Sequence, residues 1–123
     1  MQNSELYRRG IVVPLTEASQ MALKNNVVER GLEVEFCELP SEEIFLGLWD
    51  KGLFETINAQ LGSMLDDYEE EIIENKKVPM LRTILKKFEK SSEIDFIERK
   101  IVLEIIRLCD VAIKLNRSLF FIL

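Results

Sequence analysis

Residues 94–115 contain the feature that most constrains the fold of this chain: apolar side chains recur at steps of three and four over the whole stretch. A helix gathers such residues on one side, because each turn takes about 3.6 residues. The stripe consists of Ile97, Ile101, Ile105, Leu108, Ala112 and Leu115. We therefore expect a long helix at the centre of the core, opened by a capping box of Ser92 and Asp95.

Three shorter helices are indicated by their capping residues and by the apolar spacing that follows. Thr16 can cap a helix that Gly31 stops, unless the asparagines at 25–26 end it earlier. Ser41 can cap a second helix, and two glutamates follow it at the positive end of the helix dipole. Pro79 suits the first position of a third helix, where its missing N–H is not needed.

Residues 54–72 repeat the three-and-four spacing, which predicts one amphipathic helix of about five turns. Its apolar face would consist of Phe54, Ile57, Leu61, Leu65, Tyr68 and Ile72. Gly62 lies in the middle of this stretch, where glycine costs roughly 1 kcal/mol relative to alanine. The predicted helix would also carry most of the acidic residues discussed below.

Three segments have the composition of β-strands. Residues 10–14 are a short β-branched run stopped by Pro14, which predicts an edge strand because proline cannot donate to a ladder. Residues 32–39 alternate between apolar and acidic side chains, as in a half-buried strand. Residues 118–123 are almost continuously apolar, which favours a buried strand.

The predicted fold class is therefore α+β, with four to five helices and a small sheet of two or three strands that includes the C-terminal strand. A length of 123 residues matches one domain. We expect residues 1–123 to form a single globular domain that is mostly helical.

The composition excludes several kinds of chemistry. The chain has no histidine, so the Ser-His-Asp and Cys-His triads and histidine-rich zinc sites are ruled out. Cys37 and Cys109 are far apart and have apolar neighbours, which predicts buried free thiols. The five glycines are too scattered for a phosphate-binding loop or a dinucleotide fingerprint. We expect no catalytic residue, no metal site and no cofactor.

Two further features bear on location. The longest apolar run, residues 119–123, is far shorter than the roughly 20 residues that cross a bilayer. Residues 1–10 contain charged and polar side chains instead of the apolar centre of a secretory signal. The expectation is a cytoplasmic protein that makes no contact with a membrane.

Charges are sorted along the chain. Residues 1–75 contain sixteen Asp and Glu against five Lys and Arg, whereas residues 76–123 contain six against eleven. The first part thus has a net charge of −11 and the second a net charge of +5, which together give the −6 of the whole chain. Such asymmetry is typical of a protein that presents an acidic surface to a partner, although the two parts can also neutralise each other.

The acidic residues are densest in residues 66–74. On a helix, carboxylates four residues apart repel each other unless a cation lies nearby. Clustered carboxylates also speed encounter with a cationic partner, and aromatic side chains such as Trp49 can anchor it. The predicted partner-binding face consists of Asp66, Asp67, Tyr68, Glu69, Glu70, Glu71 and Glu74.

Two other interpretations of this segment remain open. The first is a solvated helix face neutralised by the downstream basic residues Lys76, Lys77, Arg82, Lys86, Lys87 and Lys90. The second is a divalent-metal site, because Glu70-Glu71-x-x-Glu74 resembles the first half of the magnesium motif of all-α nucleotide pyrophosphohydrolases. The second half of that motif, E-x-x-D, is absent downstream.

The sequence therefore predicts a non-catalytic protein–protein interaction module, in its most concrete form an immunity or antitoxin-type inhibitor of a basic toxin. The alternative is a metal-dependent nucleotide or phosphate hydrolase that uses Glu70, Glu71 and Glu74. The expected partner is a basic protein rather than a nucleic acid, since the chain is acidic overall. Homodimerisation through the edge of the C-terminal strand is kept as a further alternative.

Overall fold

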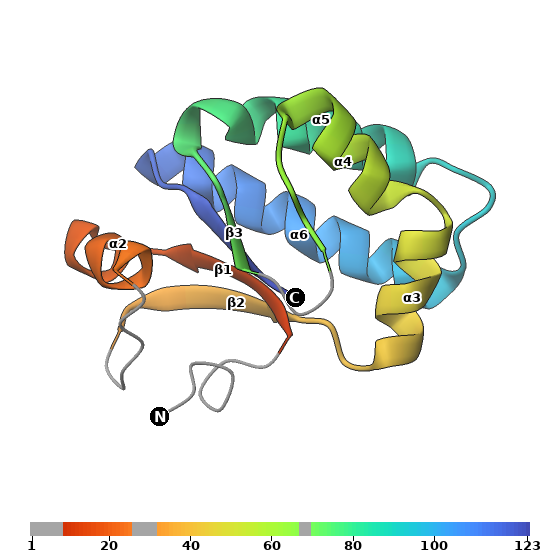
Figure 1. The fold of residues 1–123 in the computed structure, drawn as a ribbon, viewed down its shortest axis with the longest axis horizontal. Coiled ribbons are helices and arrows are strands. Elements are labelled where there is room, and N and C mark those ends of the chain that lie inside the picture. Colours follow the sequence, from red (N-terminus) through yellow and green to blue (C-terminus); the bar gives the residue numbers. More distant parts are fainter. Residues whose placement is uncertain (1–8, 26–31, 67–69) are drawn as a thin grey trace.

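The computed structural model describes residues 9–25, 32–66 and 70–123, and it contains an antiparallel sheet with helices packed on it (Figure 1). The strands are β1 (Gly10–Pro14), β2 (Val34–Glu38), β3 (Glu70–Ile73) and β4 (Leu119–Ile122). Their order across the sheet is β2-β1-β4-β3. The described helices are α2 (Glu17–Lys24), α3 (Glu42–Asp50), α4 (Leu53–Leu61), α5 (Val78–Glu89) and α6 (Phe96–Leu115). A 3₁₀ turn, η1, spans Asn75–Lys77.

The predicted α+β class is confirmed, and so is the place of the C-terminal strand in the sheet. The predicted strand number was too low, because the sheet has four strands. The added strand is β3, which lies within the segment predicted to be helical. The first strand is also not at an edge: β1 pairs with both β2 and β4. Pro14 is its last residue, so the missing N–H falls at the end of the ladder.

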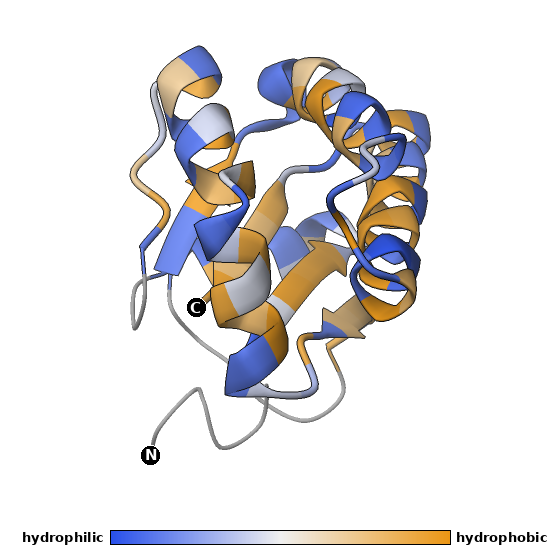
Figure 2. Cartoon of the chain, turned by 90° about the vertical axis from the view of Figure 1, so that its right-hand side faces the viewer, coloured by the Kyte–Doolittle hydropathy of each residue, from blue (hydrophilic) through white to orange (hydrophobic). Residues whose placement is uncertain are grey.

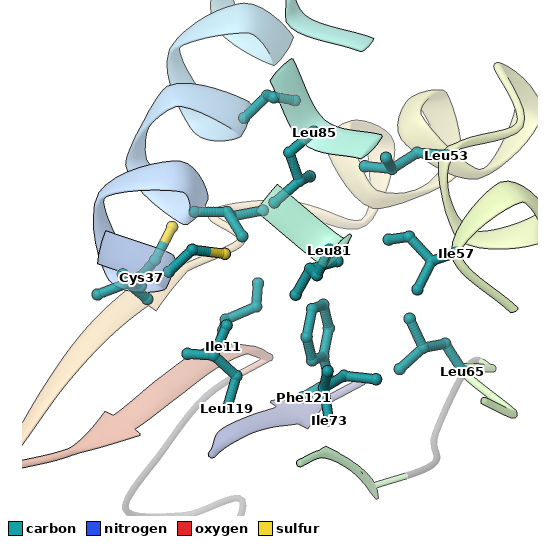
Figure 3. Packing of buried hydrophobic residues seen from close by; sticks show 14 of the residues in the cluster. Ile11, Cys37, Leu53, Ile57, Leu65, Ile73, Leu81, Leu85, Leu119 and Phe121 are labelled. Carbon is teal, nitrogen blue, oxygen red and sulfur yellow. The ribbon is translucent and has the colours of Figure 1, made fainter. Parts of the chain in front are cut away.

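The main core lies between one face of the sheet and helices α3 to α6. Alternate strand residues face it, among them Ile11, Cys37, Phe121 and Ile73. Figure 3 shows Phe121 in the middle of this cluster, with Leu81 of α5 above it. Figure 2 shows the same separation by hydropathy, with hydrophobic residues gathered between the layers and hydrophilic residues on the outer turns of the helices.

Helix α6 is the predicted central helix, but the predicted stripe is only partly buried, because Ile97 and Leu115 are exposed. Its residues Val102, Ile105, Leu108, Cys109 and Ala112 are buried in the core. The predicted start was wrong by one helical turn, because the N-cap is Asp95 and its partner in the capping box is Glu98. The N-caps predicted for two shorter helices are confirmed: the Thr16 hydroxyl accepts from the N–H of Ser19 and the Ser41 hydroxyl from that of Ile44.

The predicted helix over residues 54–72 is wrong. Helix α4 ends at Leu61, where Gly62 takes a left-handed conformation at φ 71° and donates its N–H to Asn58. A glycine at this position is a common C-terminal stop, because it adopts a positive φ without steric cost. The chain then turns back and enters the sheet as β3. Glu70 and Glu71 therefore lie on a strand and not in the expected row along one helix face.

Gly10 marks a close approach of two strands, and it gives a first stability prediction. A Cβ at this position would collide with the carbonyl oxygen of Cys37 and lie 2.8 Å from the Phe36 ring. The Cys37 carbonyl cannot move away without disturbing the β1–β2 ladder. Gly10→Ala should therefore lower the free energy of unfolding by about 3 kcal/mol, the cost of overpacking a rigid site, in urea denaturation.

The matched control is Gly52→Ala. Gly52 has φ 87° and no atom within 4 Å of a built Cβ, so only the backbone penalty of about 1 kcal/mol should appear. If both variants lose the same free energy of unfolding, the close approach of the strands is not the reason for glycine at position 10.

Candidate partner-binding groove

An open groove of about 530 Å³ lies between α3, α4 and the start of β3. Trp49 of α3 and Met64 form its apolar lining, and Glu70 and Glu71 of β3 contribute carboxylates. Met64 is 78% exposed. The groove thus places an aromatic ring and an exposed thioether beside acidic side chains.

The segment between α4 and β3 is held in place by Asn58. Its side-chain oxygen accepts from the N–H of Leu65 at 2.8 Å and from the Ser63 hydroxyl at 2.9 Å. Its amide group donates to the carbonyl of Leu65 at 3.0 Å. Leu65 itself is buried and lies beside Ile57 and Phe121 in the core (Figure 3). The groove wall is therefore fixed by polar contacts on one side and by core packing on the other.

Strand β3 is joined to this wall and is an edge strand of the sheet. The N–H of Met64 donates to Glu71 Oε2 at 2.9 Å. Residues alternate along a strand, so Glu71 shares the helix-facing side with Ile73, while Glu70 and Ile72 face the other side. We call Asp66, Glu70, Glu71 and Glu74 the acidic edge. Asp66, Glu70 and Glu74 are exposed and Glu71 is half-buried.

The structure brings together only part of the predicted face. Glu70, Glu71 and Glu74 are on or directly after β3 and Asp66 lines the groove, whereas Asp67, Tyr68 and Glu69 lie outside the described residues. The repulsion between carboxylates four apart on a helix does not arise, because Glu70 and Glu74 are at and beyond the ends of a strand. The assignment of these residues as a binding face remains a prediction.

Several ion pairs of the described residues lie away from β3. Arg107 pairs with Glu35 at 2.7 Å and with Glu104 at 2.5 Å, and these hydrogen bonds raise the pKa of its guanidinium. Lys77 donates to the carbonyl of Leu61 at the end of α4. No lysine or arginine in residues 9–25, 32–66 or 70–123 forms an ion pair with Glu70, Glu71 or Glu74.

The alternative of a magnesium site loses its geometric basis. The half-motif needs its glutamates on one helix face, whereas here Glu70 and Glu71 face opposite sides of β3. In the part of the chain that the structure describes, no group of three or more acidic, histidine or cysteine side chains is arranged to hold a metal ion.

Several residues of the groove were not found by sequence reasoning. Asn58, Ser63 and Met64 were assigned to the interior of a continuous helix. Gly62 was the available signal, because a glycine followed by a polar residue suits a helix C-terminus at least as well as a helix interior. Trp49, expected to be a core residue or an anchor, is half-buried: it packs on Phe54 with ring centroids 5.5 Å apart and also lines the groove.

The two cysteines give a prediction for alkaline pH. Cys37 and Cys109 are free and buried, and burial raises the pKa of each thiol to about 12. Unfolded thiols lose their protons near pH 9, so between pH 9 and 12 the folded state binds more protons and its stability falls as the pH rises. We expect the urea midpoint to fall more between pH 8 and pH 10.5 than in a Cys37→Ala/Cys109→Ala variant. An equal fall of the urea midpoint in the wild-type protein and in the double variant would contradict this account.

Within the described residues, no helix combines the length and the apolar character needed to span a membrane.

No protein-family model matches the sequence, and no curated protein is significantly similar to it. A solved structure with the same fold is the Neisseria DNA mimic protein DMP12. The superposition has a TM-score of 0.60 and covers 94% of this chain and 100% of the other, at 19% sequence identity. At that identity the likeness establishes a shared fold over nearly the whole chain.

The predicted partner is wrong in two respects. The prediction set nucleic acid aside, yet the protein with the same fold is described as a mimic of DNA. The prediction also allowed a homodimer through an exposed edge of the C-terminal strand. Strand β4 lies between β1 and β3, so both of its edges are already paired.

Proposed function

We propose that this protein binds a DNA-binding protein at the surface that would otherwise contact DNA. The acidic edge would take the place of the phosphate backbone, and no catalytic step is involved. The observation that carries the proposal is the position of these carboxylates: Glu70 and Glu71 lie on the edge strand β3 and Glu74 follows its end, in a fold shared with a DNA mimic protein.

The charge distribution supports this function. Residues 52–75 contain seven carboxylates and no lysine or arginine. Duplex DNA presents a regular array of negative charges, and proteins that bind it supply lysine and arginine to neutralise them. Carboxylates clustered in this way attract the same basic groups.

The rigidity of the acidic edge supports it as well. Glu70 and Glu71 are on a strand paired with β4, and the N–H of Met64 donates a hydrogen bond to one carboxylate oxygen of Glu71. Carboxylates held in place before binding lose little conformational freedom on association, which favours affinity. Protection of a sheet edge against aggregation is another use of charge, but that use does not require seven carboxylates in one stretch.

The immunity-type inhibitor is a narrower form of the same proposal. It would apply if the captured partner were a toxin that cleaves DNA. The fold and the charges favour the broader class, a protein whose DNA-contacting surface is covered.

The test is mutual exclusion between this protein and DNA. The immobilised protein is exposed to a nuclease-treated lysate of the source organism, and each captured protein is purified and bound to a labelled short duplex. We expect this protein to displace the duplex in a concentration-dependent manner, and excess duplex to release the captured protein. Captured proteins that bind duplex and this protein at the same time would refute the proposal.

A further inference from the structure

We infer that the groove beside β3 receives an arginine side chain of the partner. The inference deepens the proposed function and rests on it for the nature of the partner, because arginine is abundant on surfaces that contact DNA phosphates. It assigns a specific ligand chemistry, a planar guanidinium, to a groove that the acidic edge only borders.

The lining of the groove matches the two parts of an arginine side chain. Trp49 offers aromatic surface, on which a guanidinium stacks with a favourable cation–π energy. Met64, which is largely exposed, offers a polarisable apolar contact for the methylene stem. Glu70 and Glu71 also line the groove, and a carboxylate there can accept the fork of N–H donors.

The aromatic cluster behind the groove already accommodates one guanidinium from within the chain. Phe45, Trp49 and Phe54 pack together with centroid distances from 5.3 to 5.9 Å. The guanidinium carbon of Arg9 lies 4.2 Å from the centre of the Phe45 ring. One ring of the cluster, Phe45, thus packs against a guanidinium, and Trp49 is the member of the cluster that lines the groove.

The groove favours arginine over the other occupants. An apolar side chain would leave the two carboxylates without a partner, at a cost in desolvation. Lysine would satisfy the charge, but its compact ammonium lacks the planar fork that stacks on an indole and gives two N–H groups to one carboxylate. A nucleic acid is repelled by the same carboxylates.

Trp49 is the sole tryptophan of the chain, so its fluorescence reports on the groove directly. The intact protein is titrated with N-acetyl-arginine amide, N-acetyl-lysine amide and N-acetyl-leucine amide. We expect a saturable change in emission with the arginine compound and binding at least about threefold weaker with the lysine compound. Equal binding of arginine and lysine, or tighter binding of leucine, would overturn the inference.

Two variants and a control locate the site. Glu70→Gln and Glu71→Gln keep the size of the side chains and should each weaken arginine binding severalfold. Glu93→Gln removes the same charge from the exposed connection between α5 and α6. This control variant should leave arginine binding unchanged. Equal weakening by all three variants would show a diffuse effect of net charge rather than a site.

The inference and the proposed function can fail separately. If the protein displaces DNA from its partner but the arginine compound leaves Trp49 unaffected, the groove is not the arginine site and the proposed function stands. If the arginine compound binds but the captured partners hold DNA and this protein together, the groove assignment stands and the proposed function fails.

Discussion

Replacement of Glu98 with alanine is expected to lower the free energy of unfolding by about 3 kcal/mol, as for the loss of one partner from a buried, hydrogen-bonded charge pair. Glu98 is only 4% exposed, and its side chain makes two interactions. It accepts from the N–H of Asp95 at 2.9 Å, which completes the capping box of α6, and it pairs with Lys51 at the end of α3. The loss removes one of the two hydrogen bonds of the capping box and the ion pair that joins α6 to the end of α3. Urea denaturation monitored by far-UV circular dichroism measures the change.

Gly47 provides the test that separates this contact from helix propensity. A Cβ on Gly47 would collide with Glu98 Oε2, although alanine is intrinsically better than glycine within a helix by about 1 kcal/mol. Gly47→Ala should therefore destabilise the wild-type protein, because Glu98 is held by its own hydrogen bonds and cannot withdraw freely.

In the Glu98→Ala background the same substitution should become stabilising. A double-mutant cycle that shows additive effects would mean that the two residues do not interact.

The second large effect concerns binding. Glu70→Lys combined with Glu74→Lys should weaken association with a DNA-binding partner at least about tenfold at low salt, equivalent to about 1.4 kcal/mol. Both side chains are exposed, so the fold should survive their replacement. Glu71 is left unchanged in this variant, because its carboxylate accepts a hydrogen bond from the N–H of Met64. Isothermal titration against a captured partner at two salt concentrations provides the measurement.

The control changes the net charge by the same amount at other sites. Glu55 and Glu93 are exposed and lie outside the acidic edge, so Glu55→Lys with Glu93→Lys should reduce affinity much less. Salt should narrow the difference in affinity between the two double variants, because at 0.1 M salt interactions between exposed charges more than about 10 Å apart are largely screened. An identical loss in both would assign the binding to net charge alone.

Local sequence signals predicted the elements that depend on neighbours in the chain. The apolar stripe of α6 and the caps at Thr16 and Ser41 need only residues within a turn or two of each other. The apolar run at the C-terminus similarly predicted β4. The start of α6 was misplaced because Ser92 and Asp95 have the spacing of a cap, yet Asp95 with Glu98 forms the better capping box.

The error over residues 54–72 has a different cause. Phe54, Ile57 and Leu61 are buried on α4, and Leu65 is buried too, although it is not in a helix. Burial at helical spacing therefore continued past the end of the helix. Strand β3 forms because it pairs with β4, which lies more than forty residues further along the chain. A pattern read over a short window contains no information about that pairing.

The sequence by itself determined that this chain has a helical core packed on a sheet, lacks histidine chemistry and concentrates negative charge before residue 75. Only the tertiary structure decided where that charge is displayed. The register of β3 against β4 turns Glu70 and Glu71 to opposite faces, and Asn58 holds the wall that places Trp49 and Met64 beside them. The physical reason is that charge density is a property of local sequence, whereas a groove is made by segments that only long-range pairing and core packing bring together.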